Sequence, residues 1–299
     1  MSRGTVIGLY ALLAIIWSST WVAIKIGLED CPPLLGAGVR FAFAGLVLLG
    51  FAAAQGRSLR TDRLLAGVLA LFPFALTYGL IYWAEQYVPS GLTAVLFGVL
   101  PLYIALLGAA LLPDAPLRVP IVVGVLIAIG GLALAFLESV ELGAAEKAAL
   151  GAVAIAVSPI GAAVGNIGQK LRAAELDAVV LNGWAMLGGG LLLLAASVLG
   201  EDWGEFAWSA ESVGSIAYLA LFGSAITFVT LTVLLRHITA MAMGFLAMIL
   251  PFGALIFGAL LYDESITTRA VAGAALVATG LLIAQWPRRT RTEPAPAVA

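Results

Sequence analysis

The sequence holds few of the side chains that catalytic chemistry uses. Its single histidine is His237 and its single cysteine is Cys31, which removes most zinc sites, histidine-based catalysis and any internal disulfide. An enzyme would need a convergent acid, base or metal constellation, and the sequence offers none. We therefore expect no enzymatic activity, no catalytic residue, no metal and no cofactor.

Several of the side chains that bring a polar atom into the apolar stretches are aromatic. Trp17, Trp21 and Lys25 recur every four residues and share one helical face. Trp17 is predicted to line a cavity, with an interfacial anchor as the alternative, whereas snorkelling to the interface is favoured for Lys25. Tyr78 and Tyr82 lie one turn apart, and their hydroxyls need partners from a wet cavity or from a backbone carbonyl.

Two kinds of polar residue complete the predicted site. Tyr103 lies in an apolar stretch, and the amides Asn166 and Asn182 are expected to face the protein interior, as cavity groups or as interhelical hydrogen-bonding groups. The predicted substrate-binding residues are Trp17, Tyr78, Tyr82, Tyr103 and Asn166.

Four prolines fall inside apolar stretches. Proline removes one backbone hydrogen bond and kinks a helix, and the freed carbonyls can face a polar cavity. Each kink could be a hinge for gating or a static feature that shapes the bundle. The predicted gating or hinge residues are Pro73, Pro101, Pro159 and Pro251.

The elements that must position these residues are membrane-spanning helices. Of the 299 residues, 62% are hydrophobic and 11% charged, against about 25% charged in a soluble domain. A helix needs roughly 20 apolar residues to cross the hydrocarbon core. Charged and polar residues delimit ten such stretches, which are 3–25, 34–54, 63–85, 86–113, 118–138, 147–170, 177–201, 211–236, 237–263 and 269–288.

The distribution of positive charges gives the ten spans an orientation. Four of the 15 Lys and Arg residues, Lys25, Arg40, Lys147 and Arg269, fall on the side opposite the termini, and the others fall on the side of the termini. The positive-inside rule then places both termini in the cytoplasm, and we expect a multi-pass protein of the bacterial inner membrane.

An internal repeat divides the chain into two halves. The anchors lie 150 residues apart and are the segments 75–79 and 225–229, the pair Pro101 and Pro251, and the pair Gly130 and Gly280. Each half holds five spans, so the second must enter the membrane from the opposite side, as in many secondary transporters. The predicted fold is all-α, with ten transmembrane helices in two inverted five-helix repeats around a central cavity. The expected boundaries are 1–141 and 142–287, with 288–299 as a disordered cytoplasmic tail.

Several short motifs resemble the EamA repeat of the drug/metabolite transporter superfamily. They are Trp17-Ser-Ser-Thr20, Ala23-Ile-Lys25, Pro32-Pro33, Arg40-Phe41, the segment 258–264 that ends in Asp263-Glu264, and the glycines Gly273 and Gly280. The chain departs from the pattern at Asp114, where glutamate is usual, and in 158–168, which lacks tryptophan. Within the family the chain is similar to bacterial exporters of aromatic and other amino acids, which implies export by alternating access.

The charges inside the spans bear on how transport is driven. Arg40 is the only charge well inside an apolar stretch, and we hypothesise that it pairs with Glu85 or Glu29 near the outer face. No Asp or Glu falls in the middle of a span, where proton antiporters usually need one. Facilitated diffusion of neutral or amphipathic solutes, such as hydrophobic amino acids, is therefore expected. The alternative is proton-coupled export of aromatic cationic drugs.

Two other classes of protein compete with a transporter. An integral-membrane enzyme lacks its reactive groups here, and a receptor or assembly subunit has no obvious use for the inverted repeat. The expected partners are amino acids as small-molecule substrates and the lipid bilayer, with no nucleic acid, because the sequence has no basic stripe. Since both repeats lie in one chain, a monomer is expected.

Overall fold

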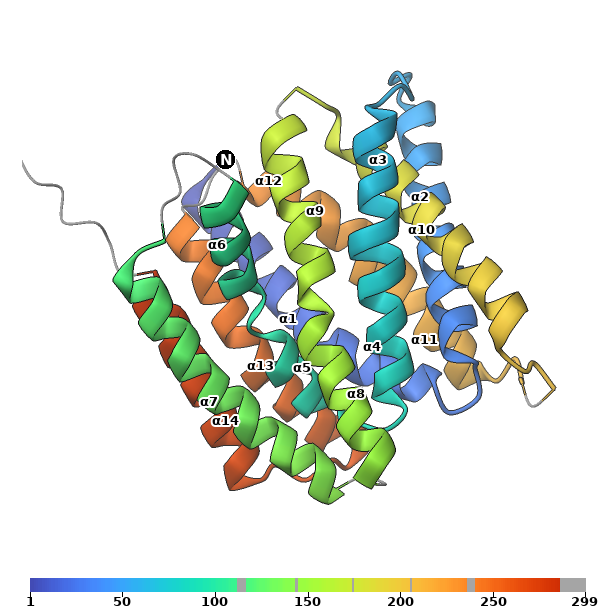
Figure 1. The fold of residues 1–299 in the computed structure, drawn as a ribbon. Coiled ribbons are helices and arrows are strands. Elements are labelled where there is room, and N and C mark those ends of the chain that lie inside the picture. Colours follow the sequence, from blue (N-terminus) through green and yellow to red (C-terminus); the bar gives the residue numbers. More distant parts are fainter. Residues whose placement is uncertain (112–116, 143–144, 174, 205, 236–239, 286–299) are drawn as a thin grey trace, which may run out of the picture.

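The computed structural model describes residues 1–111, 117–142, 145–173, 175–204, 206–235 and 240–285. Asp114 and the predicted tail 288–299 lie outside them. The described residues form α-helices (Figure 1) and two π-helices, which we call η1 and η2. In chain order these are α1 (Arg3–Gly27), α2 (Pro33–Ala54), α3 (Arg63–Leu69), η1 (Ala70–Thr77), α4 (Tyr78–Glu85), α5 (Ser90–Phe97), α6 (Leu100–Leu111), α7 (Val119–Leu142), α8 (Ala145–Val157), α9 (Pro159–Arg172), α10 (Ala178–Gly200), α11 (Ala210–Ala220), η2 (Leu221–Ile226), α12 (Thr227–Leu235), α13 (Ala240–Tyr262) and α14 (Thr268–Ala284).

These helices make up ten membrane spans, which confirms the predicted fold class. Eight helical segments are long and apolar enough to cross a bilayer, and two shorter apolar helices, Leu246–Tyr262 and Thr268–Ala284, complete the set. Span 3 consists of α3, η1 and α4, span 4 of α5 and α6, span 6 of α8 and α9, and span 8 of α11, η2 and α12. The other six spans are single helices. Five spans in each half require the second half to begin on the opposite side of the membrane from the first.

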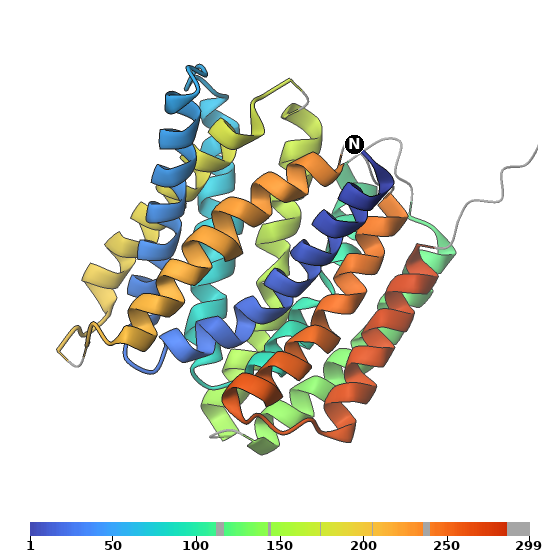
Figure 2. The same ribbon diagram turned by 180° about the vertical axis from the view of Figure 1, so that it is seen from behind.

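The packing partners of the helices follow the inverted repeat. Helix α1 (span 1) packs on α13 (span 9), and the equivalent contact joins α9 (span 6) to α6 (span 4). Spans 2 and 7 pack together as α2 and α10, and spans 5 and 10 pack together as α7 and α14. These two pairs lie at opposite edges of the bundle in both views (Figures 1 and 2). A shift of five spans therefore turns the α1–α13 contact into the α9–α6 contact, and it turns each of the other two pairs into itself.

Glycines let the paired helices meet backbone to backbone. A Cβ atom on Gly45 of α2 would lie 2.7 Å from the carbonyl oxygen of Gly183 in α10, and one on Gly131 of α7 would lie 2.6 Å from the carbonyl oxygen of Gly273 in α14. Real Cβ atoms do not approach that closely, so side chains at these positions would push the helices apart. Close approach through small residues is the usual basis of helix association in lipid.

Three of the four predicted hinge prolines coincide with an interruption of a span. Pro73 lies inside η1, Pro101 follows the break between α5 and α6, and Pro159 begins α9 after the break at Ser158. The missing N–H of proline explains each interruption. Pro251 differs, because α13 continues through it. Gating at these prolines and a central cavity stay predictions.

The third span of each repeat carries its π-helix at the same place. Helix η1 covers Ala70–Thr77, and η2 covers Leu221–Ile226, which corresponds to 71–76 after the 150-residue shift. A π-helix widens the backbone ladder, leaves it less regular and frequently occurs at functional sites. The sequence anchors 75–79 and 225–229 overlap or directly follow these widened turns.

Candidate functional site

An aromatic cluster lies where the two repeats meet. It consists of Trp17, Phe228, Phe74, Phe41 and Tyr78, named in the order in which the rings touch. The ring centroids are 6.1, 5.6, 5.2 and 4.6 Å apart along this series. Four rings come from the first repeat (α1, η1, α2 and α4), and Phe228 comes from α12 of the second. The cluster therefore joins spans 1, 2 and 3 to span 8.

Burial is not uniform along this aromatic cluster. Phe41 and Phe74 in the middle of the series are buried, whereas Trp17, Tyr78 and Phe228 are half-buried. The contacts between the rings are tilted or edge-on, which is the favourable geometry for aromatic pairs. A planar apolar solute could pack against the half-buried rings of this cluster.

Arg40 of α2 lies beside the cluster and is only 1% exposed. Its Nε donates a hydrogen bond to Oγ of Ser224 at 3.0 Å, and its Nη2 donates to the carbonyl oxygen of Gly223 at 3.4 Å. Both acceptors belong to η2. Its Nη1 donates to the hydroxyl of Tyr82 at 3.2 Å. The guanidinium carbon also lies 4.8 Å from the ring centroid of Phe41 and 5.0 Å from that of Tyr78.

These contacts correct the hypothesis that Arg40 pairs with Glu85 or Glu29. The ion pairs of the described residues join Arg57 to Asp177 and Arg172 to Asp62, and neither involves Arg40. Polar neutral groups and ring faces surround the guanidinium instead. The neutral groups accept hydrogen bonds from three of its five N–H groups, and the rings attract the cation, but none of these partners carries a negative charge.

Three of the predicted substrate-binding residues are thus brought together. Trp17 and Tyr78 belong to the aromatic cluster, and Tyr82 reaches it through Arg40. Tyr82 is only 3% exposed. The described partner of its hydroxyl is Arg40, whereas the sequence suggested a wet cavity or a backbone carbonyl. Whether the three residues contact substrate stays a prediction.

The other two predicted binding residues lie elsewhere. Tyr103 of α6 donates a hydrogen bond to the carbonyl oxygen of Ala156 in α8, at 3.1 Å. The expected burial of Asn166 is wrong: its side chain is exposed, and its amide donates to the carbonyl oxygen of Ala162, one turn earlier in its own helix. That local bond satisfies the amide without an interior partner. Asn182 is buried, as expected.

A second buried charge lies at the end of α4, two turns from Tyr78. Glu85 is 0% exposed, and its two carboxylate oxygens have no hydrogen-bond partner among the described residues. Lys25 of α1 donates to the backbone carbonyl oxygens of Glu85, at 2.5 Å, and Val88, at 3.5 Å. The lysine therefore acts as a cation at the C-terminus of α4. Uncoupled transport was expected because no carboxylate falls in the middle of a span, and Glu85 was placed near the outer face. The complete burial of Glu85 weakens the case for uncoupled transport.

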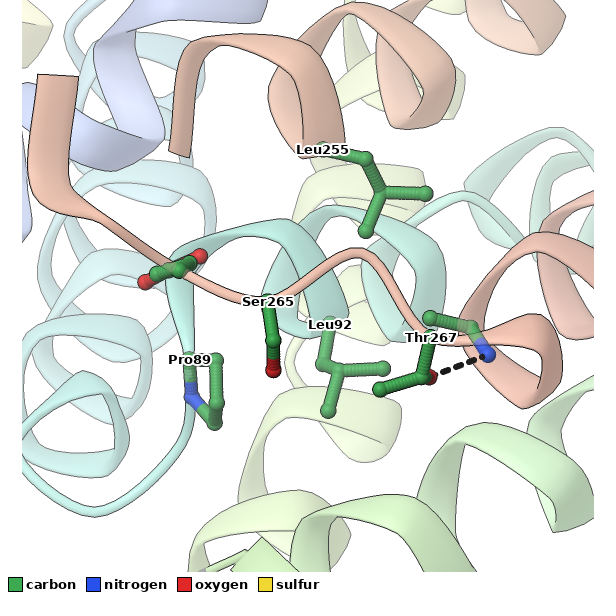
Figure 3. A pocket seen from close by; sticks show the side chains of 7 residues that line it. Pro89, Leu92, Leu255, Ser265 and Thr267 are labelled. Carbon is green, nitrogen blue, oxygen red and sulfur yellow. Dashed lines mark hydrogen bonds between the residues drawn. The ribbon is translucent and has the colours of Figure 1, made fainter. Parts of the chain in front are cut away.

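A surface hollow of about 200 Å³ lies near this end of the bundle (Figure 3). Leu92 and Leu255 line it together with Pro89, Ser265, Thr267, Ala270 and Glu264. Both carboxylate oxygens of Glu264 are occupied: they accept from the backbone N–H groups of Ser90 and Gly91 at 2.7 and 3.0 Å. Glu264 thus stabilises the N-terminus of α5. None of the predicted substrate-binding residues lines this hollow.

Sequence reasoning missed most partners of the site. It identified Arg40 as a charge inside a span but not its contacts with Ser224 and Gly223, and it did not identify Phe74 and Phe228 as partners of Trp17. The repeat anchors were the available signal, because Phe228 occupies the position of Tyr78 after the 150-residue shift and Phe74 directly precedes its anchor. Among the described residues, no group of three or more His, Cys, Asp or Glu side chains could hold a metal ion.

Comparisons with known proteins agree with this architecture. The model of the EamA-like transporter family matches residues 5–137 and 149–285, one match for each repeat. Among similar curated proteins, uncharacterized transporter YoaV of Bacillus subtilis is 28% identical over 91% of this chain and 93% of its own length. Uncharacterized inner membrane transporter YedA of Escherichia coli is 32% identical over 85% of this chain and 82% of its own length.

A solved crystal structure shows the same fold. It has a TM-score of 0.68 and 19% sequence identity, and the match covers 95% of this chain and 97% of that one. The family model alone spans nearly the whole chain in two matches. This chain belongs to the EamA-like transporter family and is a membrane transporter.

Proposed function

We propose that this transporter exports amino acids, hydrophobic and aromatic ones among other neutral ones, or related metabolites by alternating access. It acts as a monomer in the bacterial inner membrane, with both termini in the cytoplasm. The Escherichia coli relative YedA is named as an inner membrane transporter, which supports this location. The distribution of Lys and Arg supports the orientation.

The aromatic cluster carries the proposal. Its rings come from spans 1, 2, 3 and 8, so both repeats contribute to one surface. Aromatic faces attract the rings and apolar side chains of hydrophobic amino acids, and half-buried Trp17 and Tyr78 can each offer a polar tip. A binding surface shared between inverted repeats is also what alternating access requires, because the repeats must move relative to each other around the solute.

One observation favours a second candidate function, the proton-coupled export of aromatic cationic drugs. Glu85 is a fully buried carboxyl group without a described partner for its oxygens. Ionisable groups inside a membrane protein commonly mark proton or ion pathways. The charged groups that act on Glu85 are Lys25 from α1, Arg40 from α2 and Glu264 from the segment between α13 and α14. A proton or a cationic solute at Glu85 would satisfy the carboxylate.

Counterflow in proteoliposomes tests the proposal and separates the two candidates. Vesicles preloaded with unlabelled phenylalanine should accumulate labelled phenylalanine without an imposed pH gradient. Absence of counterflow with every amino acid tested would overturn the proposed substrate class. Strict dependence on the pH gradient, lost in Glu85→Gln, together with transport of an aromatic cation, would support the second candidate instead.

A further inference from the structure

We propose that Arg40 is the binding residue for a carboxylate group on the transported solute. This inference rests on the proposed function and deepens it, because it narrows the cargo to solutes that carry a carboxylate, amino acids among them. Three features of Arg40 support it: the charges around its side chain, the geometry of its guanidinium and its position between the repeats.

Arg40 is a buried cation whose described hydrogen-bond partners are all neutral. Arg40 is 1% exposed, and an arginine inside a span is costly unless a negative charge or water compensates it. The described hydrogen-bond partners of Arg40 are two hydroxyls and one backbone carbonyl, all of them neutral. The charge of Glu85 acts on Arg40 through space, but the described ion pairs do not join the two residues. A solute carboxylate would supply the missing negative charge at the place where desolvation makes it most effective.

The guanidinium geometry fits a carboxylate. A guanidinium has five N–H groups, and the three hydrogen bonds use one on each of its nitrogens. A second N–H on Nη1 and another on Nη2 have no described acceptor. Such a pair matches the two oxygens of a carboxylate in a bidentate contact. The rings of Phe41 and Tyr78, at 4.8 and 5.0 Å, hold the guanidinium beside the aromatic cluster.

The place of Arg40 between the repeats connects binding to movement. Arg40 lies on α2 of the first repeat, whereas Ser224 and the Gly223 carbonyl lie on η2 of the second. Gly223 also packs tightly against α1 of the first repeat, because a Cβ atom there would lie 2.9 Å from the methyl group of Thr20. When the repeats move apart, Arg40 loses two of its neutral partners, and a carboxylate can take their place.

A purely structural role makes a different prediction. If Arg40 only tied η2 to α2, its loss would slow the transport of every solute by the same factor. If Arg40 binds a carboxylate, its loss must slow solutes that carry one and leave analogues that lack the carboxylate less affected. The ratio between two such solutes therefore separates the roles.

The test compares phenylalanine with phenylalaninamide, which keeps the ring and the amino group but replaces the carboxylate by a neutral amide. Counterflow of each is measured in the wild type and in Arg40→Gln, after gel filtration has shown that the variant is folded. A contact between a guanidinium and a carboxylate predicts a wild-type preference for phenylalanine of about tenfold or more, lost in the variant. Ser224→Ala, which removes a neutral partner but leaves the guanidinium, is the matched control and should keep the preference.

The outcomes distinguish this inference from the proposed function. Phenylalanine counterflow in the wild type supports the proposed function whatever the variants do. Equal transport of both solutes by the wild type, or equal slowing of both in Arg40→Gln, overturns the role of Arg40. If Arg40→Gln does not fold, Arg40→Lys replaces it, because one ammonium keeps the charge but not the bidentate geometry. An undiminished preference in that variant also overturns the inference.

Discussion

The two π-helices occupy the same place in the two repeats but differ in how they are held. Helix η1 contains Pro73, which has no N–H to donate, whereas η2 has Gly223 at the position that corresponds after the 150-residue shift. Both widened turns pack against helices of the other repeat, η1 against α9 and α10, and η2 against α1 and α2. The backbone architecture is thus shared.

The side chains that bond to the two π-helices differ. At η1, the hydroxyl of Thr77 donates to the carbonyl oxygens of Phe72 and Ser158, at 2.9 and 3.0 Å, so a neutral group closes the turn. At η2, the guanidinium of Arg40 bonds to Ser224 and Gly223. The two repeats therefore share the widened turn, but a charged side chain bonds to it at η2 and a neutral one at η1.

The first prediction concerns the tightness of the contact at η1. A Cβ atom on Gly161 of α9 would lie 2.5 Å from the hydroxyl oxygen of Thr77 and 2.6 Å from the carbonyl oxygen of Phe72. Gly161→Ala should therefore destabilise the protein by about 1–3 kcal/mol through overpacking. Gly223→Ala at η2 meets the ends of side chains at 2.9 Å and beyond, which can move, and should cost less.

Thermal unfolding of the purified variants in detergent measures this difference. Gly67→Ala is the control, because nothing lies within 4 Å of a Cβ atom at that helical position. Its melting temperature should be unchanged or higher, since alanine favours helix over glycine. Equal melting temperatures for Gly161→Ala and Gly67→Ala would show that the contact at η1 is not tight.

The second prediction compares the threonines that correspond in the two repeats. Thr77→Val leaves the carbonyl groups of Phe72 and Ser158 without this donor and should destabilise the protein by about 1–2 kcal/mol. Thr227→Val removes only a weaker bond to the carbonyl oxygen of Ser224, at 3.3 Å in the same span. A smaller drop in melting temperature is expected for Thr227→Val, and the reverse order would contradict the asymmetry.

The third prediction concerns movement. Pro73→Ala restores an N–H that can bond to the carbonyl of Leu69 in α-helical register, so η1 loses its reason to stay widened. We expect the rate of phenylalanine counterflow to fall by about threefold, with stability unchanged or higher. Pro251→Ala is the matched control, because α13 is already continuous around Pro251. Equal rates in the two variants would show that Pro73 is a static kink.

The sequence was informative about the spans because ten apolar stretches between charges are a strong periodic signal, and the structure confirms that fold class. It was less informative about contacts between spans. The partners of Arg40 in the second repeat lie 183 and 184 residues away in sequence, and no local pattern shows which helix face meets which. The exposure of Asn166 and the burial of Glu85 were missed for the same reason. Both depend on the rotation of a helix against its neighbours, which apolar content alone does not determine.

The smallest expected effect lies at the starts of spans 3 and 8, the two spans that contain a π-helix. Asp62 accepts hydrogen bonds from the backbone N–H groups of Leu64 and Leu65 at the start of α3, and its other oxygen accepts from Arg172. Ser209 is the neutral counterpart at the start of α11, where it accepts from the N–H of Ser212. The bond from Leu65 and the Arg172 guanidinium hold the pKa of the Asp62 carboxyl below its usual value.

A lowered pKa in the folded state gives this cap an acid dependence with a definite sign. The ionised Asp62 stabilises the fold fully above the unfolded-state pKa of about 3.9, and that contribution is lost as the pH falls through the lower folded-state pKa. The gap in melting temperature between the wild type and Asp62→Asn, which still caps a helix, should stay constant from pH 7 to about pH 5 and close below about pH 4. The gap for Ser209→Ala should not change with pH, because no charge is removed. A constant gap for both variants would mean that the two spans begin alike, so that the asymmetry between the repeats is confined to η1 and η2.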